Sequence, residues 1–154
     1  MASFSDINEQ EGMNFLARHG WPVALQTNFI KEIRKVPKRF MIIDDSGSMS
    51  AGDGHRLIGE GIHRKVTTAT RWGEIGDFVG FHAGFSAACN VATVFRLLNS
   101  HSPIIIGCGN EDDGQGLRKL KELMQGSPGG GTPLCRHIRD IIAEIKGMYV
   151  FFSY

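Results

Sequence analysis

Three oxygen-bearing side chains alternate along the segment Asp44-Asp45-Ser46-Gly47-Ser48. Residues two apart in an extended chain point to the same side, so Asp44, Ser46 and Ser48 can converge on one point. One carboxylate and two hydroxyls form an all-oxygen set, which suits a hard cation such as Mg²⁺, or the related ions Mn²⁺ and Ca²⁺. Because both hydroxyls are neutral, they leave a divalent ion with positive charge, and it can accept a further carboxylate from a partner.

A second loop, Gly126 to Leu134, offers the complement to this segment and reads Gly-Ser-Pro-Gly-Gly-Gly-Thr-Pro-Leu. Thr132 stands at an expected N-cap and Pro133 at the first helical position, which is a favourable helix start. The three consecutive glycines permit close approach of the backbone to a neighbouring loop. We therefore expect Thr132 both to cap its helix and to face the site in the first loop.

The two loops need a scaffold that brings them together. The run Phe40 to Asp44 is short, apolar and closed by a carboxylate, which is typical of a buried parallel strand. Further strands are expected over 91–98, 104–106 and 148–152, and helices over 72–88, 113–124 and 133–146. Strands that alternate with helices predict an α/β fold with a parallel sheet, whose ligands bind beyond the carboxyl ends of the strands.

Two segments lie outside this alternation. Residues 7–36 carry apolar stripes at helical spacing on both sides of a Gly-Trp-Pro break, which predicts a helical hairpin packed on the domain. Residues 49–70 would form an unusually long loop, and the flanks of Gly59-Glu60-Gly61 instead favour a small β-hairpin. Glycines recur through the helix at 72–88, which we interpret as allowing its close approach to the sheet.

The two loops together resemble the von Willebrand factor type A domain. Asp44-x-Ser46-x-Ser48 follows an apolar strand, and Gly-Gly-Thr132-Pro-Leu follows much later. The resemblance covers roughly residues 38–152. It implies a metal-ion-dependent adhesion site in which Ser46 and Ser48 bind Mg²⁺ directly, Asp44 binds it directly or through water, and Thr132 engages when ligand is bound.

The same resemblance implies a particular fold. Arg71-Trp72 and the stretch Phe95 to Asn99 fall where the family's first helix and second strand would lie. The implied architecture is a doubly wound, mainly parallel, Rossmann-like sheet. The implied division is an N-terminal helical hairpin over 1–37 and a partial type A domain over 38–154.

The chain departs from the family after its last expected strand. The family places an Asp there, whereas Met148 to Phe152 is followed only by Ser-Tyr. We expect a domain incomplete at its C-terminus after the fourth strand, weaker Mg²⁺ affinity, and Asp45 or Asp53 as a substitute carboxylate. A strand at 148–152 would form an exposed apolar edge, which predicts self-association.

Composition excludes several functional classes. The 154 residues carry a formal charge of +1, which removes bulk electrostatics as a basis for binding nucleic acid or an anionic membrane. The N-terminus lacks the pattern of a secretory signal, and no apolar run approaches the length of a membrane span. Three cysteines without CxxC spacing argue for a reducing, cytoplasmic location.

Other interpretations of the same residues remain. The segment Asp44 to Ser48 can be a polar turn, and its Asp-Ser-Gly also resembles aspartic proteases. Gly126 to Thr132 is similar to a P-loop without its lysine. Cys135 and His137 lack a second pair of zinc ligands.

We expect a non-enzymatic, Mg²⁺-dependent module that binds an Asp or Glu of a protein partner. The alternatives are a hydrolase using Asp44-Asp45-Ser46, through metal-activated water or an aspartyl dyad, and a truncated remnant without a competent site.

Overall fold

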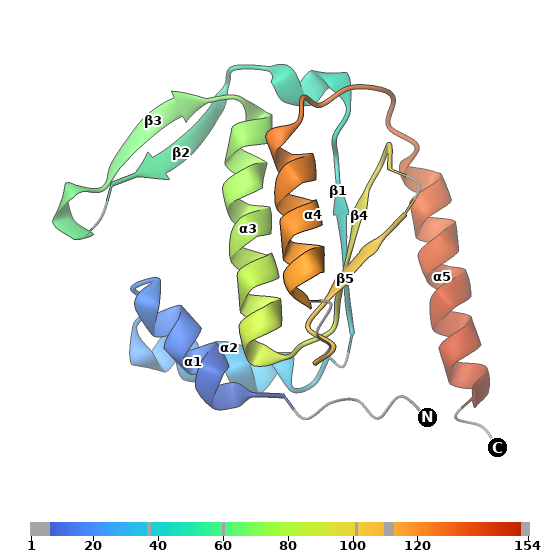
Figure 1. The fold of residues 1–154 in the computed structure, drawn as a ribbon, viewed down its shortest axis with the longest axis horizontal. Helices are drawn as coiled ribbons and strands as arrows, with labels where there is room; N and C mark the ends of the chain where they lie inside the picture. Colours follow the sequence, from blue (N-terminus) through green and yellow to red (C-terminus); the bar gives the residue numbers. More distant parts are fainter. Residues whose placement is uncertain (1–6, 37, 60, 101, 110–112, 152–154) are drawn as a thin grey trace.

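The computed structural model describes residues 7–36, 38–59, 61–100, 102–109 and 113–151, and of residues 148–151 it describes the backbone only. The helices are α1 (Glu9–Arg18), α2 (Val23–Ile33), α3 (Arg71–Cys89), α4 (Asp113–Gln125) and α5 (Leu134–Phe151) (Figure 1). The strands are β1 (Arg39–Ile43), β2 (Gly54–Ile58), β3 (Lys65–Ala69), β4 (Thr93–Leu97) and β5 (Ile104–Ile106). Short 3₁₀ turns lie at η1 (Gly47–Ser50) and η2 (Gly61–His63).

The main sheet has the strand order β1-β4-β5, with β1 and β4 parallel and β4 and β5 antiparallel. Helices α3 and α4 cover one face, where Phe95 and Leu97 of β4 are buried in the same apolar cluster as Val79 of α3 and Leu120 of α4 (Figure 1). Arg96, between the first two, points to the opposite face and bonds Glu144 of α5 at 2.9 Å. The sheet is therefore packed between helices on both sides.

The prediction of a doubly wound, mainly parallel sheet is wrong. Within the described residues the main sheet has three strands and one parallel pair, and β2 and β3 form a separate antiparallel hairpin. Helices make up most of the regular structure.

The expected final strand at 148–152 is also wrong over 148–151, where the chain continues α5 through Gly147. A short apolar run has no periodicity that separates a strand from a helix. Gly147 is not among the described glycines with positive φ, so it does not adopt the left-handed conformation of a helix C-cap. Over residues 148–151 the structure therefore offers no strand edge for the predicted self-association.

The other elements follow the predictions from the sequence, with ends shifted by a few residues. The helical hairpin is present as α1 and α2, and it packs on the C-terminal half of α3. This second apolar cluster buries Leu16, Ile30, Ile33, Phe85, Cys89 and Val91. The β-hairpin, the strands β4 and β5 and the helices α3 and α4 are likewise present.

The glycines of α3 serve contacts other than the one expected. A Cβ at Gly84 would lie 2.9 Å from Phe15 of α1, and one at Gly73 would lie 3.4 Å from Arg56 of β2. A Cβ at Gly80 would meet nothing within 4 Å. Close approach is thus made to α1 and to the β-hairpin rather than to the sheet.

His82 lies on α3 among aromatic rings, with the Phe78 ring centroid at 4.3 Å and that of Phe81 at 5.3 Å. Burial, and secondarily the Arg39 cation on β1, lower the pKa of His82 to about 4. Within the described part of the chain, its Nδ1 has no hydrogen-bond partner. The side chain is therefore neutral at neutral pH and packs among these rings.

We expect His82 to make folding sensitive to acid. Its pKa is lower in the folded state than in the unfolded state, so its contribution is complete above pH 6.5 and is lost as the pH falls towards 4. The full shift would correspond to about 3 kcal/mol, and solvent screening of the half-buried ring reduces this to about 1–2 kcal/mol. Urea unfolding at pH 7 and pH 4.5 measures the loss, and His82→Gln should reduce it by that amount. An equal loss in both proteins would contradict the prediction.

Candidate metal centre

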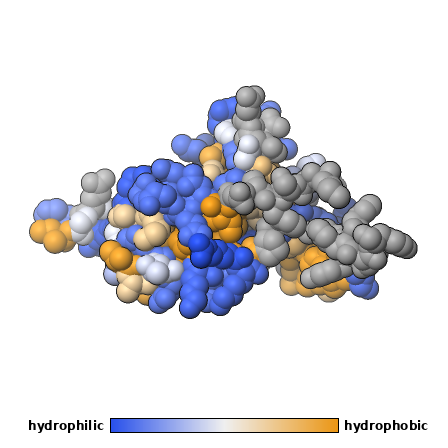
Figure 2. Space-filling model, turned by 90° about the horizontal axis from the view of Figure 1, so that it is seen from below, coloured by the Kyte–Doolittle hydropathy of each residue, from blue (hydrophilic) through white to orange (hydrophobic). Residues whose placement is uncertain are grey.

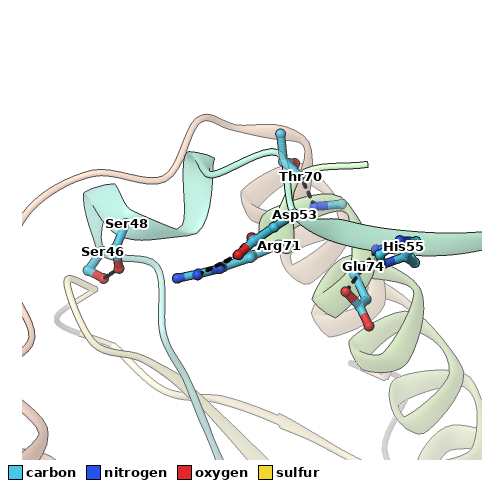
Figure 3. A network of polar contacts seen from close by, with 8 residues as sticks. Ser46, Ser48, Asp53, His55, Thr70, Arg71 and Glu74 are labelled. Carbon is cyan, nitrogen blue, oxygen red and sulfur yellow. Dashed lines mark hydrogen bonds and ion pairs between the residues drawn. The ribbon is translucent and has the colours of Figure 1, made fainter. Parts of the chain in front are cut away.

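The segment that carries Asp44, Ser46 and Ser48 leaves β1 at the carboxyl end of the strand, as predicted. The Ser46 N–H donates to Asp44 Oδ1 at 2.9 Å, and the hydroxyl oxygens of Ser46 and Ser48 lie 3.1 Å apart (Figure 3). Ser46 is 4% exposed, whereas Ser48, in η1, is open to solvent. The structure therefore brings the two hydroxyls together, one buried and one at the surface, and it sets the Asp44 carboxylate against the backbone N–H of Ser46.

The spacing of the two hydroxyls suits a metal ion. Adjacent ligands of an octahedral Mg²⁺ ion at the usual distance of about 2.0–2.1 Å lie about 2.8–3.0 Å from each other. The 3.1 Å between the Ser46 and Ser48 oxygens is close to that value. Neutral hydroxyls beside one carboxylate form the hard-oxygen set that the sequence predicts, so the residues present fit the ion.

The loop before α5 is docked against this segment by two backbone hydrogen bonds. The Gly129 N–H donates to the Asp45 carbonyl at 2.7 Å, and the Gly47 N–H donates to the Gly130 carbonyl at 3.3 Å. Thr132 follows two residues later and is exposed. The predicted approach of the two loops is thereby confirmed.

The prediction that Thr132 caps the helix is wrong. Helix α5 begins at Leu134, so Pro133 and not Thr132 immediately precedes it. The Thr132 carbonyl accepts the Leu134 N–H at 2.8 Å. Among the described residues, no hydrogen bond of the Thr132 hydroxyl is formed, and the side chain is exposed.

Asn99, which the sequence reasoning did not single out as a site residue, ties the parts of the site together. Its N–H and its side-chain amide donate to Asp45 Oδ1 at 2.9 and 2.8 Å. The same amide donates to the Gly131 carbonyl at 3.0 Å. The end of β4, the segment after β1 and the glycine loop are therefore locked to one another. The sequence held one signal for this role, because Asn99 is a polar residue just after the strand that is parallel to β1.

Neither carboxylate expected as a substitute ligand is free. Asp45 accepts the two bonds from Asn99, and Asp53 forms a bidentate ion pair with Arg71 at 2.7 Å for each bond (Figure 3). The hydrogen bond from Arg71 lowers the pKa of Asp53. Throughout the described ranges, no group of three or more His, Cys, Asp or Glu side chains could hold a metal. Asp44 therefore remains the carboxylate of the proposed ligand set.

The other candidate ligands do not form a site. His137 Nε2 lies 2.9 Å from the Leu98 carbonyl, to which it donates, while Cys135 is exposed. The thiols of Cys89, Cys108 and Cys135 are all free.

Comparison with protein-family models, with curated proteins and with solved structures finds no match to this chain. In the part of the chain that the structure describes, no helix combines the length and the apolar character needed to cross a membrane.

Proposed function

We propose that this chain is a non-enzymatic, Mg²⁺-dependent protein-binding module of the kind that the resemblance to von Willebrand factor type A domains implies. Asp44, Ser46, Ser48 and Thr132 would hold the ion, and when bound it would supply an electrophilic position for an Asp or Glu carboxylate of a partner. The 3.1 Å pair of Ser46 and Ser48 hydroxyls beside Asp44, with the Thr132 loop docked on the same segment, carries this proposal.

Exposure of the site residues supports a macromolecular ligand. Ser46 is buried and fixed to Asp44 through its own N–H, whereas Ser48 and Thr132 are open to solvent. A partner can therefore reach the outer half of the site without entering a cleft. Asp44 contributes one negative charge, so a divalent ion here retains affinity for a second carboxylate.

The contacts of the two neighbouring carboxylates disfavour the aspartyl dyad that the hydrolase alternative includes. An aspartyl dyad requires two carboxyl groups that share one proton. Asp44 instead accepts the Ser46 N–H, while Asp45 accepts two bonds from Asn99. Because the two carboxylates have different hydrogen-bond partners, they do not form the shared contact that a dyad needs. We also propose a cytoplasmic location, which the three free thiols support.

Isothermal titration with Mg²⁺ tests the proposal. We expect one site in the wild-type protein and a loss of binding in Ser48→Ala. At Mg²⁺ ten times above the measured Kd, linkage predicts about 1.4 kcal/mol of stabilisation, or roughly 3–6 °C in Tm. Ser50→Ala is the matched control, because Ser50 lies in the same 3₁₀ turn but outside the proposed ligand set. An absence of wild-type binding, or equal binding in Ser48→Ala, would overturn the metal site.

A further inference from the structure

Strand β1 is the outer strand of the main sheet, with β4 as its neighbour in the order β1-β4-β5. Arg39 donates its N–H at 2.9 Å to the carbonyl that precedes β4, and successive residues of a strand direct their backbone groups to alternate sides. Arg39, Met41 and Ile43 therefore bond β4, whereas the N–H and C=O groups of Phe40 and Ile42 point away from it. Within the described residues, these outward backbone groups have no hydrogen-bond partner.

Helix α5 presents an apolar flank beside this unpaired side of β1. Arg136 and Asp140 of α5 line a small cavity next to the β4–β5 connection, so their flank of the helix faces β5. The opposite flank carries Leu134, Ile138 and Ile142, which are 42%, 42% and 46% exposed. Because α5 contacts β1, this apolar flank lies on the side of β1 that has no neighbouring strand. Figure 2 shows hydrophobic surface at the end of the molecule that carries α5.

Helix α3 presents a second apolar flank on the other face of the sheet. Its Gly76 faces α4, because a Cβ there would lie 3.9 Å from Met124. Phe78, two positions further along, is about 160° away around the helix and is 52% exposed. Since α4 lies over β5, the flank with Phe78 is turned towards the β1 side of the sheet. We call the outward backbone of Phe40 and Ile42, with the flanks of α3 and α5 on either side, the β1 edge.

These features specify what the β1 edge can bind. Outward N–H and C=O groups that alternate along a strand are matched by the backbone of another extended segment. A strand that enters between two apolar flanks must be apolar on both of its faces, as buried strands are. Lys38, which precedes β1, is already bonded to Glu144 at 2.6 Å, so it does not select an acidic segment.

We propose that the β1 edge binds one extended segment of a partner protein, apolar on both faces, which adds a further strand to the main sheet. The backbone of that segment bonds Phe40 and Ile42, and its side chains cover Phe78 on one face and Ile138 and Ile142 on the other. A single strand fits better than a second copy of the chain. Pairing β1 with its equivalent at about 4.8 Å would bring two α5 helices, each in contact with its own β1, closer than the usual 8–10 Å.

Fluorescence polarisation in EDTA tests the proposal with the labelled peptide Lys-Lys-Val-Ile-Val-Ile-Val-Lys-Lys. One comparison peptide is N-methylated at every apolar residue, and the other has Ser in place of both Ile residues. We expect the N-methylated peptide to bind about tenfold more weakly, because it has lost the backbone donors. The Ser peptide should bind about fivefold more weakly, because one of its faces no longer buries apolar surface. No binding of the first peptide, or equal binding of the N-methylated one, would overturn the proposal.

Two variants test the two parts of the β1 edge. Ile42→Pro removes an outward N–H that β4 does not use, and it should weaken peptide binding about tenfold, whereas Ile42→Val keeps that N–H and should bind normally. Ile138→Lys/Ile142→Lys should also weaken binding about tenfold, and both positions are exposed enough to accept Lys without loss of the fold. Leu57→Lys is the matched control, because Leu57 is 56% exposed on the β2–β3 hairpin. Unchanged binding by Ile138→Lys/Ile142→Lys would overturn the proposal even if Ile42→Pro failed to fold.

Amide hydrogen exchange identifies what covers the β1 edge. We expect the peptide to slow exchange at Phe40 and Ile42, and Ser48→Ala to behave as the wild type, so the outcome is independent of the metal centre. Slow exchange at both amides without peptide would show that the chain itself covers the edge and would overturn the proposal. Protection that rises with protein concentration, together with a dimer in light scattering, would assign the edge to a second copy instead.

Discussion

Replacing Gly130 with alanine should lower the free energy of unfolding by about 2–4 kcal/mol and weaken Mg²⁺ binding more than tenfold. Gly130 has φ +95°, which L side chains rarely adopt, and an added Cβ would lie 2.5 Å from Asn99 Oδ1. The Asn99 amide cannot retreat easily, because it is held by Asp45 and by the Gly131 carbonyl. Relief of the clash must therefore move the glycine loop, and Thr132 with it.

Gly129→Ala is the control for this prediction. An added Cβ there would meet nothing within 4 Å, and Gly129 is not among the residues with positive φ. Its effect on stability should stay within about 0.5 kcal/mol. Urea unfolding and Mg²⁺ titration of the two variants give the comparison. Equal stability and equal Mg²⁺ affinity would show that the approach of Gly130 to Asn99 does not position the site.

Replacing Thr93 with valine should destabilise the protein by about 2–4 kcal/mol, although the two side chains have nearly the same shape. Thr93 is fully buried, and its hydroxyl oxygen accepts from Arg39 Nε at 3.1 Å and from Nη2 at 2.8 Å. Arg39 also donates to Ser86 Oγ at 2.8 Å. Burial lowers the pKa of Arg39, which shows how poorly its cation is solvated. Valine would remove an acceptor from this cation.

The double variant Arg39→Met/Thr93→Val isolates the cause. With the cation gone, the lost acceptor no longer matters, so the double variant should recover more than 1 kcal/mol relative to Thr93→Val alone. Thr68→Val, at an exposed position of β3, should change stability by less than about 0.5 kcal/mol. Chemical denaturation of the wild type, Arg39→Met, Thr93→Val and the double variant measures the coupling. Additive effects of Arg39→Met and Thr93→Val would reject an energetic link between them.

The local elements were predictable because each depends on residues close together in the chain. The apolar run before Asp44 predicts β1, and the flanks of Gly59 predict the hairpin that β2 and β3 form. The C-terminal segment was not predictable in the same way. Met148 to Phe151 suits a strand by composition, but it continues a helix whose periodic isoleucines precede it. A short apolar run takes the structure that its context allows.

In the candidate site, too, local features were predictable from the sequence and contacts between distant residues were not. The spacing of Asp44, Ser46 and Ser48 is a local property, and the structure places the Ser46 and Ser48 hydroxyls together, with Ser48 in the turn η1 and the Asp44 carboxylate on the Ser46 N–H. The role of Asn99 is not local, because it depends on hydrogen bonds to residues 54 and 32 positions away. The engagement of Asp53 by Arg71 likewise emerges only when the hairpin closes.

The sequence by itself determined which oxygen-bearing side chains follow β1, and it indicated that a glycine loop carrying Thr132 could approach them. Residue type and spacing along the chain are sufficient for both. Only the tertiary structure decided that the sheet is small and mixed, that Asp45 and Asp53 are already engaged, and that Gly130 packs on Asn99. These features depend on contacts between distant segments, whose partners become defined only when the chain is folded.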